Sequence, residues 1–173
     1  MTYITPDDLL QRYATGERNF AGVQFPANSS VGAFQEANLS DIILSGVNLE
    51  SFIMDRVNLS GAKMVGTYLF RSRMNLANLR DADLTGANFV RASLWKADLT
   101  DADLTGATLV KTDLFNANLT RTLFQDSLIF QVNLAKIILP EGQPRSIRCP
   151  NAYVGQTTMP DGNFEAAFKF IDA

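Results

Sequence analysis

The amino-acid sequence predicts an all-β solenoid, a single stack of short coils, and three observations carry this prediction. A large apolar residue occupies every fifth position from Phe34 to Leu139, at 22 sites without exception. Two residues before each site is a second restricted position, most often Ala and never charged. The pattern also recurs at every fourth unit, because the segments 83–102 and 103–122 agree at 10 of 20 positions. Such repetition is typical of units that stack on their neighbours.

A step of five fits neither an amphipathic helix, with a period of about 3.6 residues, nor a strand, with a period of about 2. Each unit is therefore interpreted as a short extended segment followed by a two-residue corner. The apolar and the small residue face inward, and the residue between them faces outward. On this phase Leu99→Asp should unfold the protein, whereas Thr100→Asp should be tolerated. The leucines expected in one inward core column are Leu39, Leu59, Leu79, Leu99, Leu119 and Leu139.

Glycine indicates how many units make one coil. Five Gly fall at the second corner position, and four of them recur at every fourth unit. A corner with positive φ is the place where Gly is least strained. The spacing therefore predicts one edge of a four-sided prism with four units in each coil. These corner glycines are Gly46, Gly66, Gly86 and Gly106.

Short motifs in the chain resemble a known family. ADLTD at residues 97–101, ADLTG at 102–106 and ANLTR at 117–121 resemble the A(D/N)LXX motif of pentapeptide-repeat proteins, and the resemblance runs from 32 to 141 without a gap. The stretches YATGERNF and TTMPDG are similar to segments of cyanobacterial members. The resemblance implies a right-handed quadrilateral parallel β-helix.

The N-terminal segment predicts a cap over one open end of the stack. Thr5 supplies an N-cap oxygen, Pro6 suits the first helical position, and two Asp follow near the positive end of the helix dipole. We therefore expect a capping α-helix over residues 6–15, within a cap of residues 1–17.

The repeat is expected over residues 18–141. Phe20 and Phe25 keep the step of five but lie one residue out of phase with Phe34, and a four-residue outward loop at 28–31 would restore the register. Further on, residues 142–161 are interpreted as a degraded final coil, because Cys149, Val154 and Met159 keep the phase.

Residues 162–173 predict a short C-terminal helix or a tail. Four apolar residues stand there at the i, i+3, i+4 and i+7 positions of a helix face. They are Phe164, Ala167, Phe168 and Ile171.

The composition argues against several classes of function. The net charge is −3 and Lys and Arg are not collected in one run, so no nucleic-acid groove is expected. The chain starts without a basic segment before an apolar core and has no run of 18 apolar residues, which predicts a cytoplasmic protein without membrane association. There is no His and one Cys, Cys149. We therefore predict no catalytic, metal or cofactor site, no small-molecule substrate and no enzymatic activity.

Charged side chains are predicted to form columns along the rod. A cation site in the acidic column would need converging oxygens, so hydrogen bonding at turns and between coils is the favoured interpretation of these carboxylates. The acidic column is Asp41, Asp81 and Asp101, with Asp83 and Asp103 beside it. The basic column, interpreted as a solvated face, is Arg71, Arg91 and Lys111.

Outward apolar residues are the strongest functional signal. Large apolar groups gathered on an otherwise polar surface usually mark an interface. We therefore hypothesise a non-enzymatic repeat scaffold for protein–protein interaction, with an unidentified protein partner or self-association. The alternative left open is that the C-terminal tail covers this surface. The apolar strip consists of Phe70, Val90, Trp95, Val110, Phe115 and Phe130.

The resemblance supplies a rival function. Some members of the family imitate duplex DNA in shape and charge, and they protect DNA gyrase from inhibitors by occupying its DNA-binding saddle. B-DNA bears about one charge per 1.7 Å, so a rod of roughly 30 Å would need on the order of 20 negative charges to imitate it. Because the chain carries an excess of only three, the DNA mimic ranks second.

Overall fold

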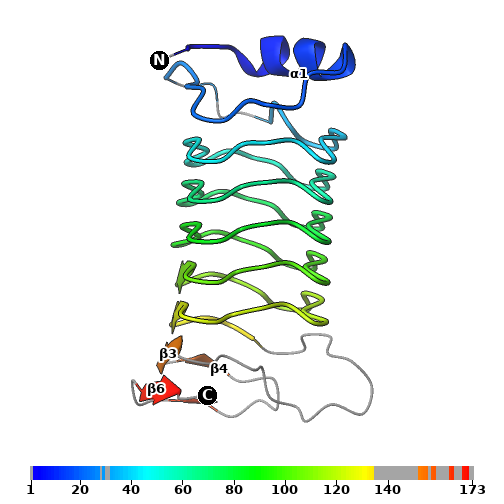
Figure 1. Ribbon diagram of the computed structural model, residues 1–173. Helices are drawn as coiled ribbons and strands as arrows, with labels where there is room; N and C mark the ends of the chain where they lie inside the picture. The colour runs from blue at the N-terminus through cyan, green and yellow to red at the C-terminus, as the bar shows by residue number, and fades with distance from the viewer. Residues whose placement is uncertain are drawn as a thin grey trace.

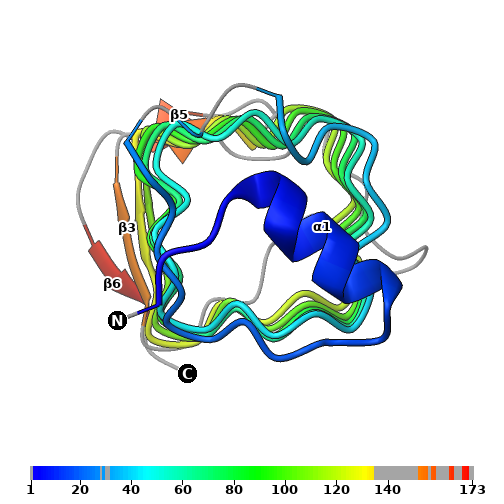
Figure 2. The ribbon, with the colours of Figure 1, turned by 90° about the horizontal axis from the view of Figure 1, so that it is seen from above.

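The computed structural model describes residues 2–27, 29, 32–134, 152–155, 157–158, 164–165 and 169–171. The described repeats form a rod of stacked coils (Figure 1) with a four-sided outline when seen along its axis (Figure 2). Parallel bridges join each outward residue to the one four units later, from Asn38 with Asn58 to Asp113 with Asn133. Four five-residue units therefore make each coil.

The backbone of each unit is hydrogen-bonded both to neighbouring coils and within its own corner. The Leu99 amide donates to the carbonyl of Asn118 in the next coil at 2.8 Å, and the Asp98 amide donates to Ala77 in the previous one at 2.9 Å. The corner closes when the Ala102 amide donates to the Leu99 carbonyl at 3.0 Å. These bonds satisfy polar backbone groups that a stack would otherwise bury unpaired.

The corners share one backbone conformation. All 20 second corner positions from residue 36 to residue 131 have φ between 54° and 70°. The four corner glycines follow this rule, but so do 15 non-glycine residues on the edges of the prism. Positive φ therefore does not distinguish the glycine edge. It excludes β-branched side chains instead, since none occurs at these 20 positions, whereas Val65, Val90 and Val110 occupy first corner positions.

The core is built from two kinds of inward-facing residue that run in rows along the rod, one large and apolar and the other mostly small. Five of the six column leucines, Leu39, Leu59, Leu79, Leu99 and Leu119, are at most 3% exposed. The sixth, Leu139, lies outside the described residues. The second row holds small side chains that fit between coils, and four of its hydroxyl groups, those of Thr67, Thr112, Thr122 and Ser127, donate to backbone carbonyls. The Thr112 hydroxyl, for example, donates to the Phe89 carbonyl at 2.8 Å.

Two serines of this second row yield a matched prediction. Ser72 is buried and its hydroxyl has no hydrogen-bond partner among the described residues, whereas the buried Ser127 hydroxyl donates to the Phe124 carbonyl at 2.7 Å. Removing an unsatisfied buried hydroxyl removes its desolvation cost, so Ser72→Ala should raise the free energy of unfolding by about 1 kcal/mol and Ser127→Ala should lower it by about 1 kcal/mol. Urea unfolding of the two variants measures both changes. Equal shifts of the same sign would contradict the assignment.

The N-terminal end is capped by α1, Pro6–Ala14. The Thr5 side chain accepts a hydrogen bond from the Asp8 amide and the Asp8 carboxylate accepts one from the Thr5 amide, which completes a capping box. The helix lies across the open end of the prism (Figure 2), with Leu9 fully buried in the core. Asn19 then bridges Ile43, whereas a regular coil would bring it opposite Leu39. The bridge is thus shifted by four residues, which is the length of the outward loop predicted at 28–31. Residues 28, 30 and 31 of that loop lie outside the described residues.

Strands at the C-terminal end extend one side of the rod. Here β1 (Thr108–Val110), β2 (Leu128–Phe130) and β3 (Ala152–Gly155) pair in parallel, and β6 (Lys169–Ile171) pairs antiparallel with β3. Ile129 lies opposite Val154, whereas a regular coil would bring it opposite position 149. The chain from β2 to β3 is therefore one five-residue unit longer than a regular coil. Two further strands, β4 (Thr157–Thr158) and β5 (Phe164–Glu165), pair antiparallel.

The predicted C-terminal helix is wrong for the described residues of that segment. Residues 164–165 and 169–171 are strands, not helix. The last parallel strand of a solenoid presents unpaired amide and carbonyl groups along its edge. A chain segment that pairs with this edge, as β6 does with β3, satisfies them. This long-range pairing outweighs the weak helical pattern of a short apolar sequence.

Candidate interaction surface

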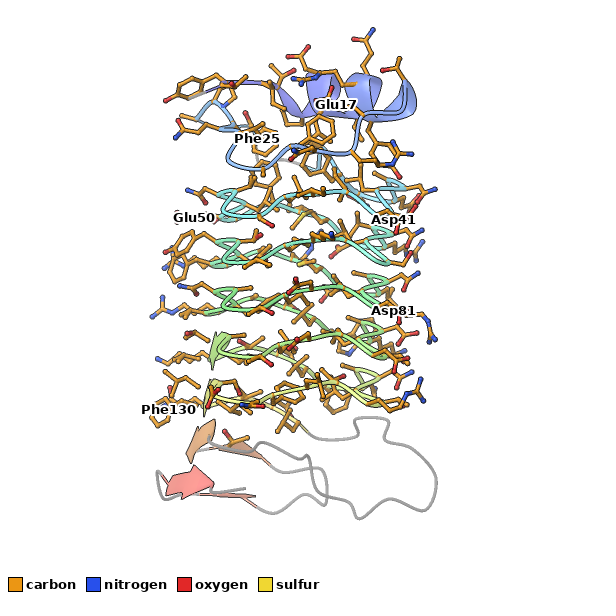
Figure 3. All side chains as sticks on the ribbon, in the orientation of Figure 1. Glu17, Phe25, Asp41, Glu50, Asp81 and Phe130 are labelled. Carbon is orange, nitrogen blue, oxygen red and sulfur yellow. The ribbon has the colours of Figure 1, made fainter. Side chains whose placement is uncertain are left out.

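The first column of the apolar strip runs along one edge of the rod. Phe70, Val90, Val110 and Phe130 follow one another one coil apart at first corner positions, and each side chain is half-buried. Phe130 lies on the side of the rod opposite Asp41 and Asp81 (Figure 3). Because consecutive coils are about 4.8 Å apart, the column presents an apolar group at each step along the axis.

The second column of the strip is separate from the first. Trp95 and Phe115 occupy the next edge, and the outward residues of the side between the two edges are polar. Ser93 donates from its hydroxyl to Asn75 at 2.6 Å, and the Asp113 carboxylate accepts from the Phe115 amide at 3.0 Å. The strip predicted from the sequence is therefore not one continuous surface but two parallel apolar columns that flank a polar side.

Sequence reasoning missed several exposed apolar residues. The Tyr68 ring stacks on the Phe70 ring with centroids 6.0 Å apart, which widens the first column on the side away from Trp95. Val65 and Leu76, in the same coil, are each 41% exposed, and Leu123 is 55% exposed. Tyr68 and Leu123 stand at the outward position in the middle of a unit. An examination of these middle positions, in addition to the corners, would have found both.

The basic column runs beside the first apolar column. Arg71, Arg91 and Lys111 are exposed, each one residue after an apolar member of the edge. The Arg71 guanidinium lies 5.0 Å from the centre of the Phe70 ring. None of the three forms an ion pair with a residue that the structure describes. The ion pairs that it does show are Arg12 with Glu17, Arg56 with Glu36, Arg73 with Asp55, Arg80 with Asp98 and Arg121 with Asp101.

The two carboxylates beside the acidic column accept hydrogen bonds from the corner that follows each of them. Asp83 accepts from the Thr85 amide and hydroxyl, and Asp103 accepts from the Thr105 amide. Within the part of the chain that the structure describes, no group of three or more His, Cys, Asp or Glu residues is placed to hold a metal ion.

Two carboxylates of the repeat, Asp98 and Asp101, have pKa values below their ordinary range. For Asp101, the hydrogen bond from Arg121, with Nε 2.6 Å from Oδ1, lowers the pKa. For Asp98, burial raises the pKa, but hydrogen bonds from the hydroxyl and amide of Thr100 and from Arg80 lower it by more. Both groups are therefore ionised at neutral pH, and each is offset by the arginine that pairs with it.

The C-terminal strands bear on what covers the strip. β3 pairs with β2 as the next strand along the axis, and β3, β4 and β6 lie at the end of the rod (Figure 1). These described strands therefore lengthen the stack. Phe115 and Phe130 each take part in another interaction, so Phe70, Val90 and Val110 form the centre of the candidate surface.

A cavity of about 630 Å³ opens near the N-terminal end of the rod. Tyr3, Phe25 and Phe52 supply aromatic walls, and Glu50 is its one carboxylate among the described residues. No described basic side chain lines it, so it offers no pair of groups for acid–base chemistry. Among the described residues there is also no helix long and apolar enough to cross a membrane.

Comparisons with known proteins agree with this architecture. A pentapeptide repeat protein from the thylakoid lumen of Arabidopsis thaliana is 33% identical, with a TM-score of 0.53, over 54% of this chain and 66% of that one. The chain thus spans just under two thirds of that protein. QnrB1, a plasmid-mediated fluoroquinolone resistance protein, has a TM-score of 0.53 at 12% identity, over 92% of this chain and 83% of that one. Among curated protein sequences none matches significantly.

A cyanobacterial pentapeptide repeat protein, Rfr23 from Cyanothece 51142, is 24% identical over 72% of this chain and 85% of that one, with a TM-score of 0.35. Because one neighbour comes from a thylakoid lumen, the cytoplasmic location stays a prediction. The family model for pentapeptide repeats matches residues 34–69, 64–94 and 82–121, in eight copies. The neighbours imply a right-handed β-helix, and the chain belongs to the pentapeptide repeat family.

Proposed function

We propose that this chain is a non-enzymatic scaffold that binds another protein through the apolar strip. The observation that carries the proposal is the first column, in which one half-buried apolar side chain per coil is held in register along a single edge. Binding through such a column needs little ordering of the scaffold, because ladder hydrogen bonds already fix each coil to its neighbours. The second column, Trp95 and Phe115, is proposed as the flank of the same interface.

The rival function, imitation of duplex DNA toward DNA gyrase, is less well supported. A DNA mimic needs negative charge along its whole length. This chain has a net charge of −3, and the edge with the first apolar column carries Arg71, Arg91 and Lys111. The likeness to QnrB1, at 12% identity, extends to the fold alone. We therefore rank protein binding through the apolar strip first.

The test compares two substitutions of the same kind on different edges. Immobilised wild-type protein is expected to retain a protein from an extract of the source organism, or to self-associate in sedimentation. Val90→Asp with Val110→Asp should abolish this, because two charges would be desolvated in the interface. Val65→Asp, at an equivalent corner on another edge where Val65 is 41% exposed, should leave it unchanged.

Circular dichroism and thermal unfolding establish that the variants keep their fold. A Trp95→Asp, Phe115→Asp variant then shows whether the second column takes part. A wild-type chain that stays monomeric and retains nothing, or a Val90, Val110 variant that retains the same proteins, would overturn the proposal.

A further inference from the structure

We propose that the partner contributes an acidic amphipathic helix, which lies along the rod axis on an apolar–basic edge. This edge is defined by Phe70, Val90 and Val110 together with Arg71, Arg91 and Lys111. The inference rests on the proposed function, since it specifies which kind of protein segment the first apolar column binds.

The cations of this edge differ in their partners from the other described arginines of the repeat after residue 50. Arg56, Arg73, Arg80 and Arg121 each pair with a carboxylate, for example Arg73 Nε with Asp55 Oδ2 at 2.7 Å. Arg91 and Lys111 have no such partner among the described residues, and Arg71 only approaches a ring. Stacked one coil apart, at about 4.8 Å, the three cations repel one another. Carboxylates of a partner would relieve this repulsion.

The spacing of the edge favours a helix over an extended segment. Arg71 and Lys111 are two coils apart, so their backbones are separated by about 9.6 Å. Side chains at i, i+3 and i+7 of a helix rise by about 4.5 and 6.0 Å, about 10.5 Å in total. Alternate residues of a strand are about 6.7 Å apart and lose register with the coils after one step. A helix axis parallel to the rod therefore matches carboxylates to all three cations.

The same helix can use the apolar column. Val90 and Arg91 are neighbours in sequence, so the apolar and basic columns run in parallel, one residue apart at every coil. A helix with an apolar stripe beside an acidic stripe, both repeating every three to four residues, meets both columns at once. A charge at the rim of an apolar contact chiefly sets specificity and association rate, while the apolar contact supplies affinity.

Two other occupants fit less well. A second copy would have to offer α1, the helix that the structure describes, but Leu9 of α1 is buried in its own core and α1 carries Arg12 among its acidic residues. A nucleic-acid strand carries a negative phosphate at every nucleotide, and this chain also has a net negative charge of −3. Such a strand would also leave the apolar column without an apolar partner.

The experiment measures binding of three probes to the full chain by fluorescence anisotropy. The first is a synthetic helical peptide with Leu at i, i+3 and i+7 and Glu at the same spacing on the adjacent face. The second replaces each Glu with Lys, and the third is a single-stranded DNA oligonucleotide. The Glu peptide should bind at least about 10-fold more tightly than the Lys peptide, with an affinity that falls as salt is raised.

A matched pair of charge reversals locates the site. Arg91→Glu should weaken binding of the Glu peptide by about 10-fold, whereas Lys63→Glu should change it by less than about 2-fold, because Lys63 lies on a different side of the rod. Position 91 accepts Glu without backbone strain beyond that already present, since Glu36 occupies an equivalent corner at φ 59°.

Each outcome decides between the occupants. Equal affinity for the Glu and Lys peptides, an unchanged Arg91→Glu variant, or tighter binding of the DNA would overturn the inference. If Val90→Asp with Val110→Asp abolishes protein binding but Arg91→Glu does not, the proposed function stands and only the acidic helix is refuted. If the Val variant binds its partner normally, the proposed function itself fails.

Discussion

Leu99→Asp is expected to unfold the protein. Leu99 is fully buried in the inward column, stacked between Leu79 and Leu119 of the adjacent coils. A carboxylate there would lie in an apolar row with no cation to pair with, so we expect a loss of more than about 4 kcal/mol in the free energy of unfolding. Because each coil is held by its neighbours, the loss should appear as cooperative unfolding, measured by circular dichroism during a thermal or urea titration.

The matched control is Leu76→Asp. Leu76 is 41% exposed and has φ 60°, a backbone conformation that Asp adopts more readily than Leu. It also lies between Arg56 and Lys96 in its corner column, so the new carboxylate would meet two cations. We expect this variant to be at least as stable as wild type. Comparable thermal midpoints for Leu99→Asp and Leu76→Asp would show the inward phase to be wrong.

Thr100→Asp, which the sequence pattern marks as harmless, is not a suitable control. Thr100 is only 3% exposed, and its hydroxyl donates to the Asp98 carboxylate at 2.6 Å. An Asp at this position would replace a donor with a second negative charge beside Asp98. The structure therefore corrects the expectation, and we expect Thr100→Asp to be destabilising.

Gly106→Val is expected to have the second largest effect. Gly106 has φ 68°, and a β-branched side chain is strained there whatever the space around it. The Gly106 amide donates to the Gln125 carbonyl of the next coil at 2.8 Å, so the corner cannot relax its φ without losing a ladder bond. We expect a loss of about 1–3 kcal/mol in the free energy of unfolding, measured from urea midpoints.

Two controls separate strain from bulk. Gly106→Asn should be tolerated, because Asn116 already occupies an equivalent corner at φ 59°. Thr105→Val should also be tolerated, since Val65, Val90 and Val110 stand at first corner positions. If Gly106→Val and Thr105→Val shift the midpoint equally, the backbone conformation is not the cause.

Much of the fold could be predicted from the sequence because a solenoid repeats one local solution. The step of five places Leu39 and Leu99 in the same inward column, and both are buried. The recurrence at every fourth unit predicts the four-unit coil, which bridges between successive coils show. The cap at Thr5 and Pro6 is likewise a local signal, and α1 begins at Pro6. Periodic and local patterns depend on residues that are close together in the sequence, so they can be recognised without knowing the fold.

What only the tertiary structure decided involves residues that meet across coils. Positive φ at Arg91 or Lys111 is not a local preference; it is imposed by the ladder bonds that fix each corner, such as that from the Lys111 amide to Phe130. Side-chain pairing across coils has the same origin: Arg73 reaches Asp55, while Arg91 finds no carboxylate in the described part of the chain.

The surface and the C-terminal end depend on the stack in the same way. The division of the apolar strip into two columns follows from the polar side that carries Ser93 and Asp113. The strands at 164–165 and 169–171 replace a predicted helix because β6 satisfies an edge that the stack creates. The inward phase was determined by the sequence alone, since burial of one apolar row dominates each unit. Corner strain, ion pairing and the last strands were decided by the tertiary structure, since their energies depend on partners that are distant in sequence and meet only once the coils have stacked.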